Sequence, residues 1–260
     1  MAAISIRPRG ALAAAALALL AGCATAPEGQ IADPYEPMNR QVHAFNKSLD
    51  ATVLRPISRA VRRGDGEAVT ASAAPNPHPW EPGPGPVEMV GNFGSNLSLS
   101  GKVVNSLLQG RPQPAAQNAA RFLVNSTLGL AGVFDPAGRE FALQEIDTDF
   151  GETLHVWGVP AGAYLELPVL GPSTERDFAG KIVDFVLIDP LDSVLTSEQK
   201  AAGTVARIVS KAGERARFGS TVDSVLHDSA DSYAQARLLY SQHRRFELKQ
   251  EEDVIDPYAD

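Results

Sequence analysis

Apolar residues recur at helical spacing along much of this 260-residue chain. From Glu36 to Val61 they follow one another three or four residues apart, which is typical of one face of an α-helix. Pro56 lies inside this segment and is expected to end or kink the helix near Arg55. The predicted apolar face is formed by Val42, Phe45, Leu49, Val53, Ile57 and Ala60.

Further helices are predicted in the rest of the chain. Helical spacing of apolar residues recurs at 101–109, 114–128, 178–186 and 205–209. The segment from Asp231 to Gln250 is predicted to be a final helix of about 20 residues, on the order of 30 Å long. Glycines and prolines dominate between 150 and 175, where we expect turns and short extended pieces. The pattern as a whole predicts a mainly α-helical fold with little strand.

The segment 64–86 has a different composition. It holds six prolines and four glycines among 23 positions, and Trp80 is its single large aromatic residue. Such a composition cannot supply a regular apolar face, so we expect a proline-rich loop or extended linker.

The segment 125–138, NSTLGLAGVFDPAG, is unusually apolar for a connection between helices. The run from Leu128 to Phe134 is much shorter than the roughly 20 residues of a membrane-spanning helix. It lacks the strict alternation of a half-buried strand. A phosphate-binding loop, a turn buried in the core and a turn that contacts lipid are the three interpretations of this segment.

The N-terminus has the pattern of an exported lipoprotein. Arg7 and Arg9 precede the apolar run 11–21, and small residues follow, as in a secretory signal peptide. The sequence Leu20–Ala21–Gly22–Cys23 resembles a bacterial lipobox, which implies cleavage before Cys23 and diacylation of its thiol. We therefore expect a signal peptide at 1–22 and a lipidated tether at 23–32. A lone cysteine cannot form an internal disulfide, which agrees with a different role for this thiol.

Charge narrows the range of partners. Removal of the signal peptide, with Arg7 and Arg9, takes the net charge from −8 to −10. This charge disfavours nucleic acids and binding driven by anionic headgroups. Any further contact with lipid should therefore be apolar, and a chain with 44% hydrophobic residues has enough of them.

No local motif points to catalysis, a metal or a cofactor. The segment 94–103, GSNLSLSGKV, has six residues between its glycines where a phosphate loop has four, and no G-x-S-x-G is present. His227, Asp228 and Ser229 are consecutive, so a helix would point them apart. We attribute the acidic cluster Glu145, Asp147, Asp149 and Glu152 to helix capping and solvation. The chain is thus predicted not to be an enzyme.

Six blocks of sequence resemble one family, the MlaA/VacJ outer-membrane lipoproteins. They occur in the family's order at 33–56, 91–97, 103–110, 121–138, 149–177 and 231–247. The fourth reads RFLVNSTLGLAGVFDPAG and the fifth begins DFGETLHVWGVPAG. The resemblance implies one helical domain at 33–247, ring-like or disk-like in shape, followed by an acidic tail at 248–260.

The resemblance also implies a function. Members lie in the inner leaflet of the outer membrane beside trimeric porins and take mislocalised glycerophospholipids from the outer leaflet through an amphipathic channel. They pass these lipids to a soluble periplasmic carrier, and no bond is made or broken. An envelope hydrolase or phospholipase and a purely structural porin-associated lipoprotein are the alternatives. A hydrolase would require a nucleophile and a base within about 3 Å of each other.

Lipidation at Cys23, with a diacylglycerol and an N-acyl chain, is the one modification that the sequence predicts. Ala24 follows this cysteine where inner-membrane retention signals have aspartate, which favours the outer membrane. As a hypothesis, the lipid channel or its gate is lined by Phe45, Asn46, Leu128, Leu130, Val133, Phe134 and Asp135. The alternative for the apolar members of this set is ordinary core packing between two helices.

Overall fold

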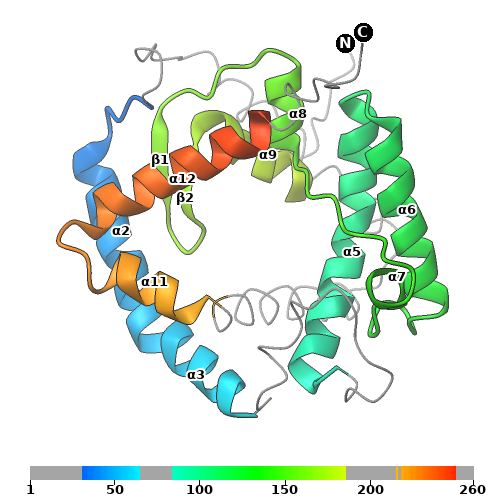
Figure 1. Cartoon of the computed structure of the whole chain (residues 1–260). Coiled ribbons are helices and arrows are strands. Elements are labelled where there is room, and N and C mark those ends of the chain that lie inside the picture. The colour runs from blue at the N-terminus through cyan, green and yellow to red at the C-terminus, as the bar shows by residue number, and fades with distance from the viewer. Residues whose placement is uncertain (1–30, 65–83, 186–214, 216–217, 250–260) are drawn as a thin grey trace, which may run out of the picture. The chain divides into compact units, whose positions relative to one another are not determined.

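The computed structural model describes residues 31–64, 84–185, 215 and 218–249. Cys23, Trp80 and the apolar face at 205–209 lie outside the described residues. The chain divides into two compact units, each assembled from segments that are distant in sequence (Figure 1). The first unit comprises Met1–Leu49, Phe150–Val183 and Thr221–Asp260, and the second comprises Asp50–Asp149 and Asp184–Ser220. The described residues are mainly helical, as predicted.

The helix predicted at 36–61 is present, but its interruption differs from the prediction. It consists of α2 (Glu36–Leu49), a π-helical turn η2 (Asp50–Leu54) and α3 (Arg55–Gly64). Pro56 is the second residue of α3 and does not end the helix. Pro56 has no N–H, so it cannot donate the α-helical hydrogen bond to the residue four positions before it. The wider π-helical turn lies in the residues directly before α3.

In the first unit, α2 packs against a short antiparallel hairpin. Its strands are β1 (Tyr164–Leu167) and β2 (Gly171–Thr174), with Tyr164 opposite Thr174. Helices α9 (Glu175–Val183) and α12 (Ser232–Lys249) also pack against the hairpin. The unit further contains α8 (Phe150–Val156) and most of α11 (Gly219–Leu226). The hairpin and α12 agree with the predicted extended pieces and final helix.

Helix α8 contradicts the prediction of turns and extended pieces throughout 150–175. Its residues 150–154 are all buried, and it packs against α9. The contact is so close that a Cβ on Gly180 would come within 2.3 Å of the Gly151 nitrogen. Two glycines that weaken a helix locally thus permit close helix packing, which the local sequence pattern does not reveal.

The second unit is built on two packed helices, α5 (Pro86–Leu108) and α6 (Pro112–Thr127), followed by the short α7 (Pro136–Arg139). Helix α6 agrees with the prediction. Helix α5 begins at Pro86, whereas only 101–109 was predicted to be helical. The glycine- and serine-rich first half is helical because tertiary contacts override weak propensity: Leu99 and Asn96 are buried, and Asn96 binds the chain beyond α6.

The buried positions of both units are unusually polar. Among the described residues, buried hydrophobic positions are few and often alanine, whereas asparagine, serine, threonine and charged side chains are frequent. Residues that are completely enclosed include Asn39, Ser58, Ser106, Asn118, Thr153 and Ser173. Many large apolar side chains are exposed instead, so the usual distribution is partly reversed.

Candidate functional site

The apolar segment after α6 forms a tight turn. Helix α6 ends at Thr127, and the chain reverses within seven residues to reach Asp135, where α7 begins. Six amides of the turn donate to main-chain carbonyls, those of Leu128, Gly129, Ala131, Gly132, Val133 and Phe134. The turn is therefore a defined, hydrogen-bonded structure.

Both glycines of the turn are sterically required. A Cβ at Gly129 would lie 2.5 Å from the carbonyl oxygens of Asn125 and Phe134. Gly132 has a φ of 92° and lies against Asn96, whose Cβ would be 2.4 Å from an added Cβ. These contacts agree with the prediction that the glycines allow the chain to fold back.

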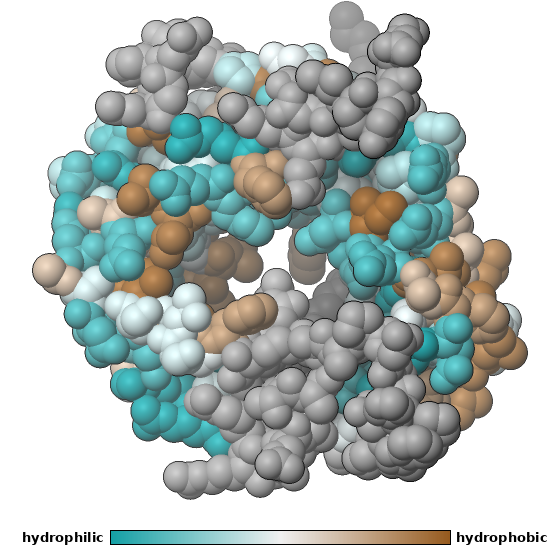
Figure 2. All heavy atoms as spheres, in the orientation of Figure 1, coloured by the Kyte–Doolittle hydropathy of each residue, from teal (hydrophilic) through white to brown (hydrophobic). Residues whose placement is uncertain are grey.

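The leucines of this turn point outward. Leu128 and Leu130 are each 66% exposed, so they do not fill a core between two helices. Val133 and Phe134 are only partly exposed. Figure 2 shows hydrophobic surface gathered over the end of α6 and the segment that leads to α7. The core-packing interpretation is therefore wrong for both leucines, whereas their role as a gate stays a prediction.

Asp135 closes the turn through several bonds. Its carboxylate accepts hydrogen bonds from Arg121 Nη2 at 3.0 and 3.1 Å and from Asn125 Nδ2 at 2.8 Å. It also caps α7 by accepting from the Gly138 N–H at 3.1 Å. Arg121 is 6% exposed and carries the opposite charge. Asp135 thus holds the chain in place, which differs from contact with a lipid.

Phe45 and Asn46 belong to the first unit, whereas residues 128–135 belong to the second. Phe45 is 52% exposed on α2. Asn46 binds the hairpin: its Nδ2 donates to the Leu167 carbonyl at 2.9 Å, and its Oδ1 accepts from the Val169 N–H at 2.8 Å. Asn46 therefore has a clear structural function, and its predicted contact with lipid remains a hypothesis.

A buried polar network between α2, the hairpin and α12 was not predicted. Asn39 donates to Asp33 at 2.9 Å and to the Tyr164 carbonyl at 3.1 Å, and it accepts from the Glu166 N–H at 3.0 Å. Asp33 also accepts from the Tyr233 hydroxyl and from Arg237. Burial and the hydrogen bond to Asp33 raise the pKa of Tyr233. The network fixes the start of α2 to α12, almost 200 residues away in sequence.

Within this network, three residues have the order of a hydrolase triad. His43 Nε2 lies 3.1 Å from the Ser232 hydroxyl, and His43 Nδ1 lies 3.3 Å from Glu166. All three are buried. Asp231, which precedes the serine, accepts the Ala234 N–H and occupies the helix end where an oxyanion would need donors. The arrangement therefore meets the distance requirement of a hydrolase, but its serine is buried and the adjacent helix end is occupied by Asp231.

A second polar cluster joins α9 to α12. Asp177 accepts from Arg176, Arg244 and the Tyr240 hydroxyl, and its side chain is 4% exposed. Burial opposes ionisation of this carboxyl group, but the charges of Arg244 and Arg176 outweigh it and lower its pKa. Burial and the neighbouring Asp177 raise the pKa of Tyr240. The cluster anchors the final helix.

The residues that raised chemical alternatives in the sequence have structural partners. Lys102, in the rejected phosphate-loop segment, lies within helix α5 and pairs with Glu145 and with Asp147. These two acids pair with Lys102 instead of capping a helix, and the 83% exposure of the Asp147 side chain agrees with the predicted solvation. Ser229 donates to the Val225 carbonyl at 2.6 Å, so it does not join His227 in a triad.

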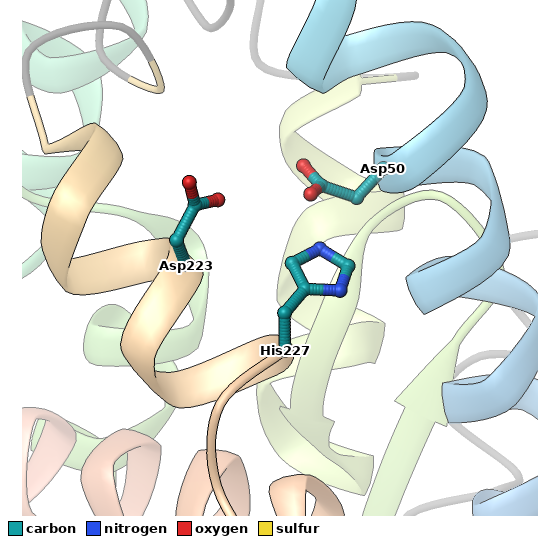
Figure 3. Close-up of side chains that lie close together, drawn as sticks. All are labelled: Asp50, Asp223 and His227. Carbon is teal, nitrogen blue, oxygen red and sulfur yellow. The ribbon is translucent and has the colours of Figure 1, made fainter.

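Asp223 and His227 lie one turn apart at the end of α11 (Figure 3). Asp50, the third side chain drawn there, belongs to the second unit, where Arg215 donates to it at 2.8 and 3.0 Å. An aspartate that is already neutralised by arginine is a poor cation ligand. Asp50 thus already has a structural partner within its own unit.

No helix in the described part of the chain is both long and apolar enough to span a bilayer. The described residues thus define a mainly helical protein with a polar interior and many exposed apolar side chains. The sequence profile of the MlaA lipoprotein family matches residues 31–247, and the chain belongs to this family. The predicted family is confirmed. It is a family of lipoproteins rather than of enzymes, which agrees with the predicted lack of catalysis.

Relatives and a solved structure support this assignment. An Escherichia coli K12 protein named intermembrane phospholipid transport system lipoprotein MlaA is 33% identical, over 90% of this chain and 88% of its own length. A Rickettsia felis protein is 31% identical, over 88% of this chain and 82% of its own. A structure solved in work on the "structural basis for maintenance of bacterial outer membrane lipid asymmetry" matches with a TM-score of 0.63 and 29% identity. The match covers 84% of this chain and 99% of the chain in the solved structure.

Proposed function

We propose that this chain is an outer-membrane lipoprotein that removes mislocalised glycerophospholipids from the outer leaflet through an amphipathic channel and passes them to a soluble periplasmic carrier. The relatives named for intermembrane phospholipid transport support the class of cargo. A trimeric porin is the proposed membrane partner, as the family resemblance implies.

The observation that carries the proposal is the reversed distribution of polar and apolar side chains. In the second unit, apolar side chains that are at least half exposed include Leu107, Leu123, Leu128, Leu130, Phe141 and Phe185. In the first unit they include Met38, Phe45, Trp157, Val169, Leu170 and Phe246. Burial of a large apolar side chain stabilises a protein by about 1.5–3 kcal/mol, and each of these side chains lacks that stabilisation when it faces water. An acyl-chain environment removes this cost without any change of fold.

The buried polar side chains complement that exterior. Several form hydrogen bonds that hold irregular segments to helices. Asn118, for example, donates to the Ile146 carbonyl at 2.8 Å and accepts from the Ile146 N–H at 3.1 Å. Satisfied main-chain groups are what a hydrocarbon environment requires of irregular backbone. The interior therefore suits a protein whose loops lie next to lipid.

The proposed anchor is Cys23, which carries a diacylglycerol and an N-acyl chain. Several acyl chains give firm attachment, at about 0.8 kcal/mol per buried methylene. Cys23→Ser should leave unprocessed precursor and abolish the acylated mature form. Normal processing and membrane attachment of this variant, measured by intact mass and fractionation, would contradict the anchor assignment.

The experiment that tests the function is a measurement of lipid asymmetry in cells that lack the protein. Their outer leaflet should accumulate glycerophospholipid at the surface, and the wild-type chain should restore asymmetry. Unchanged asymmetry in the deletion strain would overturn the proposal. Accumulation of lysophospholipid dependent on the chain would favour a hydrolase, and porin binding without any lipid effect would favour a structural lipoprotein.

A further inference from the structure

The turn after α6 contains an unusual backbone conformation. Leu130, Ala131 and Gly132 are consecutive residues with positive φ, at 50°, 60° and 92°. Glycine adopts this left-handed region freely, but leucine and alanine do so at a cost in stability. Two non-glycine residues in succession there are rare, and such outliers cluster at functional positions.

Helix α5 holds the turn in this conformation. Asn96 is 3% exposed, and its Nδ2 donates to the Ala131 carbonyl at 3.3 Å and to the Ser126 hydroxyl at 3.0 Å. Asn92 donates to the Val133 carbonyl at 3.3 Å. Two asparagines of α5 thus bind the main chain of the turn, and Gly132 packs on Asn96, so the turn is held directly against α5.

The side chain of Leu130 contributes little to this arrangement. It is 66% exposed and is carried by a backbone conformation that favours glycine. A glycine at this position would fit the same φ without strain, so neither the packing of the turn nor its backbone conformation requires a leucine here. We propose that Leu130 contacts an acyl chain of the transported glycerophospholipid. This inference rests on the proposed function and assigns to one residue a contact with cargo.

Three features favour an acyl chain over a protein partner. Residues 125–134 carry no charge, so they offer no electrostatic complement to another protein. Most amides of the turn already donate to main-chain carbonyls of the turn itself or of the last residues of α6, as hydrocarbon contact requires. A seven-residue turn is also far smaller than the roughly 800 Å² that each partner buries in a stable protein interface. An acyl chain needs only a fixed apolar surface.

A photoreactive amino acid at position 130 tests the contact directly. After irradiation of whole cells, intact mass analysis of the purified chain should show an adduct with the mass of a glycerophospholipid. The same amino acid at Glu140, an exposed polar position in the same unit, is the matched control and should give no such adduct. Cross-linking of position 130 to a porin or another protein alone would overturn the proposal in favour of a partner contact.

A pair of glycine variants separates strain from contact. Leu130→Gly and Ala131→Gly both relieve a left-handed non-glycine residue, and each should raise Tm by about 2–4 °C. Ala131→Gly should keep normal lipid asymmetry, whereas Leu130→Gly should lose it at least in part. Leu130→Met, which retains an apolar side chain, should also function normally. A fall in Tm for Leu130→Gly, or normal asymmetry with this variant, would contradict the inference.

Failure of this inference can be told from failure of the proposed function. Purified wild-type chain that retains glycerophospholipid, combined with no lipid adduct at position 130, would refute the role of Leu130 alone. A wild-type chain that retains no phospholipid and does not affect asymmetry would refute the proposed function itself.

Discussion

Asn96 on α5 and Gly132 in the turn after α6 are so close that a Cβ added to the glycine would lie 2.4 Å from the Cβ of the asparagine. This contact joins the two helices of the second unit at the turn. Asn92 and Asn96 also donate to the Val133 and Ala131 carbonyls of the turn, and these tertiary contacts favour a helix at 86–100.

We expect Gly132→Ala to destabilise the second unit strongly. The variant combines a φ of 92° with a clash against buried side-chain atoms, and together these should cost about 3–5 kcal/mol. Gly110→Ala is the matched control, because Gly110 has a φ of 74° and no atom within 4 Å of an added Cβ. The control should lose only about 1–2 kcal/mol by chemical denaturation. Equal losses would show that the contact with Asn96 is unimportant.

Asp135→Asn should be destabilising because it leaves the buried guanidinium of Arg121 without its counter-charge. The free energy of unfolding should fall by about 2–4 kcal/mol. This is less than for a fully buried ion pair, because the aspartate side chain is 25% exposed. Asp147→Asn, whose side chain is 83% exposed beside Lys102, should cost less than about 1 kcal/mol. Comparable unfolding midpoints for the two variants would refute this account.

Asp177 should make stability depend on acid pH. Its pKa is lower in the folded protein than in the unfolded chain, so the stabilisation is present above about pH 4 and is lost as the pH falls through the lowered value. The Tm of the wild type and of Asp177→Asn should be measured from pH 7 to pH 2. The difference between the two Tm values should become smaller as the pH falls.

The control for this titration is Asp231→Asn. Arg40, followed by the Ala234 N–H, lowers the pKa of Asp231 to about 2, but this residue is exposed, and solvent screens its contribution. The difference in Tm between Asp231→Asn and the wild type should therefore stay small and nearly constant from pH 7 to pH 2. A deficit of Asp177→Asn that stays constant from pH 7 to pH 2 would mean that this carboxyl group is not the source of the pH dependence.

Ser232→Ala tests whether the buried serine, His43 and Glu166 have any catalytic role. We expect normal lipid asymmetry and unchanged lysophospholipid, since the serine hydroxyl is enclosed and Asp231 occupies the helix end. A fluorophosphonate probe should not label the wild-type chain. Labelling of Ser232, together with lost asymmetry in the variant, would restore the hydrolase alternative.

The sequence predicted those elements whose apolar spacing is regular. Helices α2, α6 and α12 follow this rule. It failed for the first half of α5, where Asn92 and Asn96 bind distant carbonyls, and for α8, where Gly151 faces Gly180. In these two helices the stabilising contacts come from residues distant in sequence, so the local spacing of apolar residues cannot predict them.

The candidate site was predicted in part for a similar reason. The apolar run at 128–134 is visible in the sequence, but periodicity cannot tell a core turn from a lipid-facing one, since both are apolar. The exposure of Leu128 and Leu130 decides against the core. The network from Asp33 to Tyr233 and Arg237 could not be predicted, because it joins residues 200 or more positions apart.

The most direct test of lipid transport is mass spectrometry of the lipids that remain bound to the mature protein purified from its own envelope. A fusion of residues 23–32 to an unrelated soluble domain, carrying the same anchor, corrects for lipid held by the anchor alone. If the chain transports phospholipid, the full chain should retain intact glycerophospholipid in a fixed ratio above this control. Retention equal to that of the fusion, or recovery of cleaved lipid only, would contradict it.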